Sequence, residues 1–256
     1  MLFRSLLLSP YQVEVLFVLC TLLGGRRKID AQELMKSNRI ILILDDMFER
    51  LPWDHRCSGN RDDSAENSNE QQAGMHGPGC ECTPESAMCV QYLRLVHNFC
   101  DRDCDNYSGR RLLLSTDERK FIFEDHMASE YGAPKLSPGL LSKIVAAFVS
   151  ELDESPYRFW LASCVESYLR GSSSLEQVFV AKSGLMEHLI GDVTCQRLHC
   201  AGSLQTSFDL LGELCKGNIE VLSLLVTYLE NEEKFRKLMS VAASNLVDSN
   251  RSEEHT

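Results

Sequence analysis

The sequence repeats itself at an offset of 146 residues. When segment 9–37 is placed over segment 155–183, seven of 29 positions are identical without a gap, and the matches begin with the Ser-Pro-Tyr runs at Ser9 and Ser155. Each copy is predicted to form a long helix closed by a glycine, a short helix, a tight turn and a third helix. This pattern is typical of armadillo or HEAT units of about 40 to 47 residues, so the offset would hold about three units and an insertion. A chance similarity within an ordinary all-α domain is the alternative.

Helix signals continue through the rest of the chain. Ser-Pro pairs or capping-box spacings predict helix starts at Ser9, Ser115, Ser137, Ser155 and Ser174. The apolar run 40–44 could be a buried strand, but it continues at helical spacing, which favours a helix over about 39–51. Further helices are predicted over 30–37, 84–99, 137–152, 155–170, 174–184, 185–193, 203–216, 219–229 and 232–246. We therefore predict an all-α fold, an armadillo/HEAT-like helical-repeat solenoid with a long polar loop insertion, in which stacked units share one core.

A polar segment divides the chain. Residues 54–83 contain almost no large apolar side chain, and the stretch from Asp54 to Glu85 holds seven acidic and two basic residues, a net charge of −5 out of −11 for the whole chain. Such a stretch is too long for an ordinary connection and indicates an inserted loop. The expected organisation is helical repeat units at 1–53, the acidic loop at 54–83, repeat units at 84–250 and a tail at 251–256.

The first 25 residues allow two interpretations. Arg4, two apolar runs and the closing Gly24-Gly25 resemble a signal peptide. Glu14 and the polar residues before it interrupt the apolar run, which is too short to span a membrane. We expect a buried helix and no integral membrane segment, with a secreted helical protein as the alternative.

Cysteine content and charge narrow the class of protein. Eleven cysteines are an odd number in a chain long enough to form its own core. Several, such as Cys89, Cys100 and Cys164, lie in apolar helical patterns, where a free thiol behaves as a small hydrophobe. These features indicate a reduced intracellular protein. The acidic balance argues against nucleic-acid binding, which needs a basic face.

Several blocks of sequence resemble a known family. In this order and at these spacings they are similar to the short transient receptor potential channel 4-associated protein family over about residues 11–250, although family members are much longer. The blocks that carry the resemblance are Tyr11–Leu23, Phe159–Trp160 with Val165–Gly171, Gly184–His188, Ser207–Leu214 and Leu246–Asn250.

The resemblance implies a binding role. Such proteins are scaffolds in tumour-necrosis-factor receptor signalling and associate with calcium-permeable channels. They also act as substrate-recognition subunits of a cullin-RING E3 ubiquitin ligase, docking on its damage-specific DNA-binding protein adaptor and presenting a Myc-type substrate. By this likeness we expect a cytoplasmic ligase adaptor, with the perinuclear region as a candidate location. A signalling scaffold without ligase assembly is the alternative.

The acidic loop carries one candidate metal site. His76, Cys80 and Cys82 form a His-x-x-x-Cys-x-Cys pattern, and His55 could complete a tetrahedral set for structural zinc. The family has a similar pattern at these four positions, whereas Cys57 has no counterpart. A metal would anchor a loop that has no core of its own. An unliganded flexible loop is the alternative.

No enzyme motif is present. The sequence lacks the glycine-rich phosphate and dinucleotide motifs, the His-Glu-x-x-His zinc motif and the Gly-x-Ser-x-Gly elbow. We therefore expect a non-enzymatic protein. Phe159 and Trp160, with Arg158, could form an interface anchor, or they could be core residues at the start of a repeat helix. The acidic pairs Asp45-Asp46 and Glu232-Glu233 are expected on solvated faces.

Overall fold

A computed structural model describes residues 2–51, 53, 84–100, 109–124, 136–151, 155, 157–194 and 201–253. Over these ranges the chain is helical and contains no β-strand, which confirms the predicted all-α class. The helices are α1 (Leu2–Leu23), α2 (Lys28–Ser37), α3 (Ile40–Phe48), α4 (Pro84–Cys100), α5 (Thr116–Phe123), α6 (Leu140–Ser150), α7 (Arg158–Arg170), α8 (Ser174–Val180), α9 (Met186–Thr194), α10 (Ala201–Cys215), α11 (Ile219–Tyr228) and α12 (Glu232–Glu253). A 3₁₀ turn, η1 (Gly109–Leu113), precedes α5, and a π-helical turn, η2 (Ala181–Leu185), joins α8 to α9.

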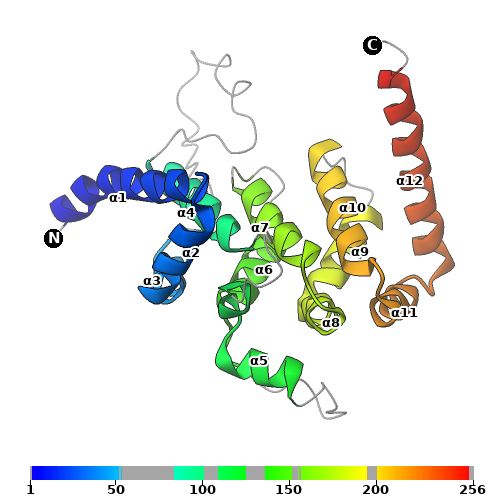
Figure 1. The fold of residues 1–256 in the computed structure, drawn as a ribbon. Coiled ribbons are helices and arrows are strands. Elements are labelled where there is room, and N and C mark those ends of the chain that lie inside the picture. The colour runs from blue at the N-terminus through cyan, green and yellow to red at the C-terminus, as the bar shows by residue number, and fades with distance from the viewer. Residues whose placement is uncertain are drawn as a thin grey trace, which may run out of the picture.

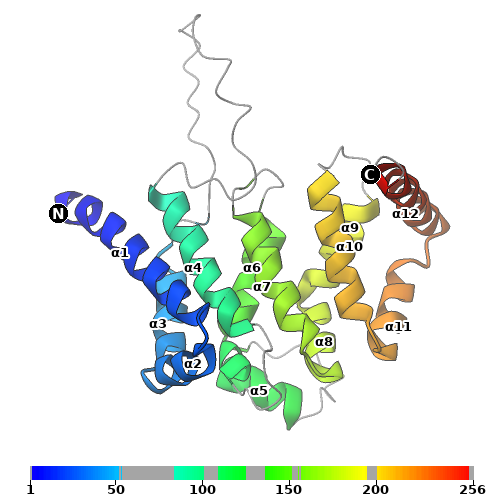
Figure 2. The ribbon, with the colours of Figure 1, turned by 45° about the horizontal axis from the view of Figure 1, so that its top comes forward.

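The helices pack in chain order. The long helices α1, α4, α7 and α10 form a row in which each packs against the next (Figures 1 and 2). A second set of neighbours links α5 to α8 and α8 to α11, and a third links α3 to α6, α6 to η2 and α9 to α12. Every third helix therefore has the same kind of neighbour.

The offset seen in the sequence also relates helix boundaries. Helices α2 and α8 begin at Lys28 and Ser174, and α3 and α9 begin at Ile40 and Met186. Both pairs of starting residues are 146 positions apart. The short and third helices of segment 9–37 and of its later copy therefore begin in register.

Capping side chains fix several helix starts. Ser115 accepts from the Glu118 N–H, and the Glu118 carboxylate accepts from the Ser115 N–H, which completes the predicted capping box of α5. Ser173 and Glu176 form the same box at α8, one residue before the predicted start at Ser174. At α11, the Asn218 side chain accepts from the first-turn N–H groups.

The helix predicted to start at Ser9 starts earlier, and its burial was predicted wrongly. Helix α1 runs from Leu2 to the predicted end at Leu23, because the leucine-rich residues before Ser9 also favour a helix. It packs against α4 and α2 and buries Leu16 and Leu23, yet a stripe of its apolar side chains is exposed. The predicted face of α3 is also partly wrong, because Leu44 is buried whereas Ile43 is exposed.

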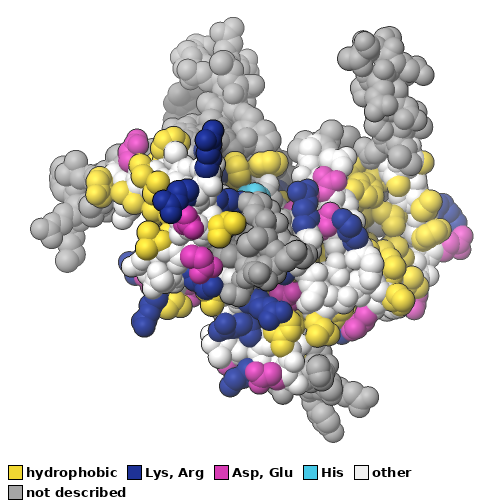
Figure 3. Space-filling view, in the orientation of Figure 1, with side chains coloured by type: hydrophobic (Ala, Val, Ile, Leu, Met, Phe, Trp, Pro, Cys, Tyr) yellow, Lys and Arg dark blue, Asp and Glu magenta, His cyan; other side chains and the backbone are white. Residues whose placement is uncertain are grey.

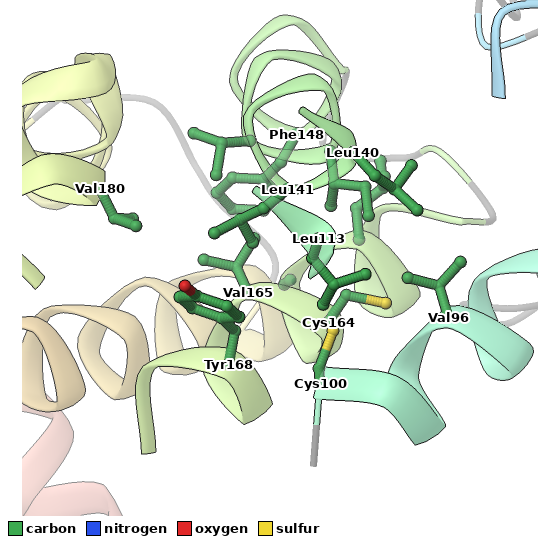
Figure 4. Close-up of a cluster of buried hydrophobic side chains, with 14 of the residues drawn as sticks. Val96, Cys100, Leu113, Leu140, Leu141, Phe148, Cys164, Val165, Tyr168 and Val180 are labelled. Carbon is green, nitrogen blue, oxygen red and sulfur yellow. The ribbon is translucent and has the colours of Figure 1, made fainter. Parts of the chain in front are cut away.

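The core lies between the rows of helices. All five residues predicted to face inward from α4 are buried: Met88, Tyr92, Leu95, Val96 and Phe99. Figure 4 shows Val96 and Cys100 of α4 meeting Leu141 of α6 and Cys164 and Tyr168 of α7. Long-range hydrogen bonds add to this packing, since the Tyr92 hydroxyl donates to the Leu44 carbonyl oxygen at 2.6 Å.

The thiols in the described ranges are free. Cys89, Cys100 and Cys164 are buried, as predicted, whereas Cys20 and Cys215 are partly exposed. Burial raises the pKa of the Cys164 thiol well above its ordinary value, and the neighbouring Cys100 adds to the shift. These thiols therefore act as protonated core side chains. Among the described helices, none is long and apolar enough to cross a membrane.

Candidate protein-interaction groove

A surface groove lies where the first three long helices meet. It has a volume of about 300 Å³, and it is lined by Phe17, Cys20 and Thr21 of α1, Arg94, His97 and Asn98 of α4, and Trp160 of α7. Because α1, α4 and α7 come from distant parts of the sequence, only the packing of the row creates this groove. Figure 3 shows cationic, apolar and histidine side chains intermixed over the middle of the molecule.

Trp160 is the centre of an aromatic and cationic cluster. The Arg94 guanidinium carbon lies 5.6 Å from the centroid of the Trp160 ring, at cation–π range. The His97 ring meets Trp160 edge-on at 6.3 Å between centroids, and Phe159 meets it edge-on at 5.5 Å. Phe159 is half exposed, and Trp160 is only partly buried. This combination of a large ring and a guanidinium resembles the residues that dominate protein interfaces.

Backbone contacts hold the walls of the groove in place. The Asn98 side chain donates to the Arg94 carbonyl oxygen at 2.8 Å, and Gln32 of α2 donates to the Asn98 carbonyl oxygen at 2.7 Å. The Cys20 thiol donates to the Gln91 carbonyl oxygen at 3.7 Å, which links α1 to α4. Desolvation raises the pKa of Cys20 to about 11, despite the opposing effect of Arg94. Cys20 is thus a neutral lining residue rather than a nucleophile.

The predicted aromatic cluster is partly reassigned. Phe159 and Trp160 lie at the surface as an interface anchor would, but Arg158 points away from them into a buried network. The cation of the cluster is Arg94, which the sequence reasoning missed because it lies more than sixty residues away in the chain. A cationic residue near an aromatic pair in sequence was the wrong signal, since a helix turns successive side chains to different faces.

Arg158 joins three helices from within. Its guanidinium donates to the carbonyl oxygens of Phe148 at 3.1 Å and Glu151 at 2.8 Å, at the end of α6. It also donates to the Asp192 carboxylate of α9 at 3.1 Å. His188 lies 3.3 Å from the same carboxylate oxygen. Arg158 therefore caps one helix and pairs with a charge on another.

The same network does not have the order of a catalytic triad. The Ser207 hydroxyl donates to Asp192 at 3.4 Å rather than to a histidine, and Ser207 is buried. A nucleophile needs its base within hydrogen-bond reach and a path to substrate. These side chains cross-link α7, α9 and α10 instead.

A second buried polar cluster lies beside α8. The Tyr168 hydroxyl donates to Glu176 at 2.9 Å, and Arg110 of η1 lies 3.5 Å from the same carboxylate and stacks over the Tyr168 ring. Desolvation and the nearby carboxylate raise the pKa of Tyr168 well above its ordinary range, so the phenol stays a hydrogen-bond donor. The sequence indicated only a cap near this position, not the cluster.

The acidic pairs lie at the surface, as predicted, but one member connects helices. Asp45 of α3 accepts from Lys143 of α6 at 2.9 Å, whereas Asp46 pairs only within its own helix, with Arg50. Glu232 and Glu233 pair with cations one turn along α12.

The predicted zinc ligands His55, His76, Cys80 and Cys82 lie outside the described residues, as does Cys57. Within the ranges that the structure covers, no cluster of three or more histidine, cysteine or acidic side chains is arranged to hold a metal ion.

Fold and surface together define the class: an all-helical protein with an open aromatic and cationic groove between its long helices. Residues 31–252 match a family model described as a protein of unknown function (DUF3689), and the chain belongs to this family.

Two curated relatives are similar to this chain. The short transient receptor potential channel 4-associated proteins of Homo sapiens and Mus musculus are each 30% identical to it over 94% of its length. The chain spans about 30% of the length of these relatives. By name, those proteins associate with a channel. No solved structure matches the chain significantly.

Proposed function

We propose that the protein is a non-enzymatic scaffold that binds partner proteins on an armadillo-type solenoid. The observation that carries this proposal is the groove centred on Trp160, an exposed aromatic anchor with a guanidinium against its face. Such a site suits an extended or helical segment of another protein, since aromatic and arginine side chains contribute most to such contacts.

The solenoid proposal is supported by the order of packing. The long helices form one row, and the helices between them have recurring neighbours at each step along the chain. The common offset of the helix starts supports the same interpretation. Stacked helical units of this kind produce long binding surfaces.

The partner class comes from similarity alone. Because its relatives are named as channel-associated, we propose that this chain binds a short transient receptor potential channel complex at the cytoplasmic side. The family resemblance extends the proposal to a substrate-recognition role in a cullin-RING ubiquitin ligase that promotes degradation of its targets. It also extends the proposal to structural zinc in the acidic loop.

An affinity pull-down tests the scaffold proposal. The tagged chain is expressed in cells, and channel, ligase adaptor and cullin are quantified in the eluate. Trp160→Ala should lower recovery of the bound partner by about tenfold or more, as expected for an interface anchor. Arg236→Ala, on an exposed salt bridge of α12, serves as the matched surface control. Equal recovery with both variants would reject the groove as the binding site. Recovery of the channel without adaptor or cullin would favour the signalling scaffold.

A further inference from the structure

Helix α1 exposes an apolar stripe along one side. Tyr11, Val15, Val18 and Leu22 follow each other at spacings of three and four residues, so they lie on one helix face. Their side chains are 69%, 40%, 54% and 54% exposed, respectively. A contiguous apolar face of this kind normally packs against another element or marks an interaction site.

The later copy of the repeat shows what covers such a stripe. The residues 146 positions further on are Tyr157, Leu161, Cys164 and Tyr168, and all four are fully buried. Helices preceding α7 cover them, since the Cys164 thiol donates to the Leu93 carbonyl oxygen of α4 at 3.4 Å. Figure 4 shows Cys164 and Tyr168 packed in the core with side chains from α4 and α6. The stripe on α1 is thus the equivalent of a surface that α4 and α6 cover on α7.

The equivalence extends beyond the first helix. Leu34 of α2 and Ile43 of α3 are 66% and 56% exposed, whereas their equivalents Val180 and Leu189 are buried. The exposed face therefore spans α1, α2 and α3 and has the width of a contact between whole three-helix groups. Its missing neighbour is a three-helix group placed as α4, α5 and α6 are placed next to α7.

The opposite end of the molecule exposes apolar side chains of its own. Helices α10, α11 and α12 follow one another as α4, α5 and α6 do, and α10 packs against α7 as α4 packs against α1. Leu222 and Val226 of α11 and Phe235 and Met239 of α12 are each 43–63% exposed. Figure 3 shows hydrophobic side chains gathered over α1 at one end and over α11 and α12 at the other.

We propose that the α1 stripe binds the α10–α12 end of a second copy of this chain. The second copy would supply the group that stands before α1 as α4–α6 stands before α7. Both end faces are apolar, they lie at opposite ends of the row, and they differ from each other (Figure 1). The contact is therefore head-to-tail, and its repetition produces chains of molecules rather than a closed symmetric dimer.

Complementary variants of the full chain test the head-to-tail arrangement. Val18→Glu with Leu22→Glu places charges on the stripe, and Phe235→Glu with Met239→Glu places them on α12; all four sites are about half exposed, so the fold should survive. By light scattering on a sizing column, the wild type should grow in mass between about 1 and about 100 µM. Each variant alone should stay monomeric. An equal mixture of the two should form a heterodimer and nothing larger, because one good face of each kind remains.

The mixing result separates this proposal from its competitors. A wild type that is monomeric at every concentration overturns it, as does a stripe variant that still self-associates. If the mixture stays monomeric, like faces bind each other and the head-to-tail contact is wrong. Cross-links from α1 to a different polypeptide in cells would also overturn it. Leu112→Glu, at an exposed leucine of η1, is the control and should associate like the wild type. If a double variant loses its helical circular dichroism, Tyr11→Glu, at the most exposed stripe position, replaces it.

Discussion

Arg158→Met should be among the most destabilising single substitutions in this protein. The guanidinium is only 7% exposed and holds the end of α6 and Asp192 of α9 together from the start of α7. Methionine keeps much of the volume but leaves two helix-end carbonyls without this donor and the Asp192 carboxylate without its permanent cation.

The size of the effect follows from the burial of that charge. Removing one partner of a buried pair costs about 3–5 kcal/mol. Asp192 is 17% exposed and keeps Ser207 and His188 as neighbours, so we expect the lower end, about 3 kcal/mol. For a chain of this size, that corresponds to a fall in Tm of about 6–12 °C.

Thermal and urea unfolding, followed by circular dichroism, would measure this effect. Arg170→Met is the matched control: Arg170 is 61% exposed and pairs with Glu166 one turn away, so its loss should cost about 0.5 kcal/mol or less. Adding Asp192→Leu to Arg158→Met removes the stranded charge and should restore about 1 kcal/mol or more. A loss below about 1 kcal/mol for Arg158→Met, or no recovery in the double variant, would refute the assignment of Arg158 as a structural cross-link.

Three further predictions concern other parts of the molecule. Tyr92→Phe removes the buried bond to the Leu44 carbonyl and should lower the free energy of unfolding by about 1 kcal/mol in urea titrations, without changing the fold. Gly139→Ala should destabilise by about 2 kcal/mol or more, because the new methyl carbon would lie 2.3 Å from the Ser115 nitrogen; an unchanged Tm would contradict this. Protein purified without chelators should carry about one equivalent of zinc by mass spectrometry, and less than about a tenth of an equivalent would reject the predicted loop site.

The recurrence of sequence and the capping signals allowed much of the local structure to be predicted. The capping box at Ser115 formed as predicted, and the five inward residues of α4 were identified from helical spacing alone. Both depend on interactions within one or two turns of helix, which neighbouring residues determine. The start of α1 was placed too late, because a Ser-Pro pair permits a helix start without requiring one.

The groove could be predicted only in part. Phe159 and Trp160 attracted attention as an aromatic pair, but Arg94 and His97 reach Trp160 only because α4 packs beside α7. Arg158, adjacent in sequence, turned out to be a buried cross-link. Spacing along the chain indicates which residues share a helix face, whereas it does not indicate which face of another helix lies opposite.

The sequence by itself therefore determined helix type, most helix ends, and the internal equivalence at an offset of 146. Only the tertiary structure decided which copy of the repeated apolar stripe is covered. Tyr157 and Tyr11 occupy equivalent positions, yet one is buried and the other 69% exposed. The physical reason is that local propensity and capping are properties of a segment, while burial depends on the helix that packs against it.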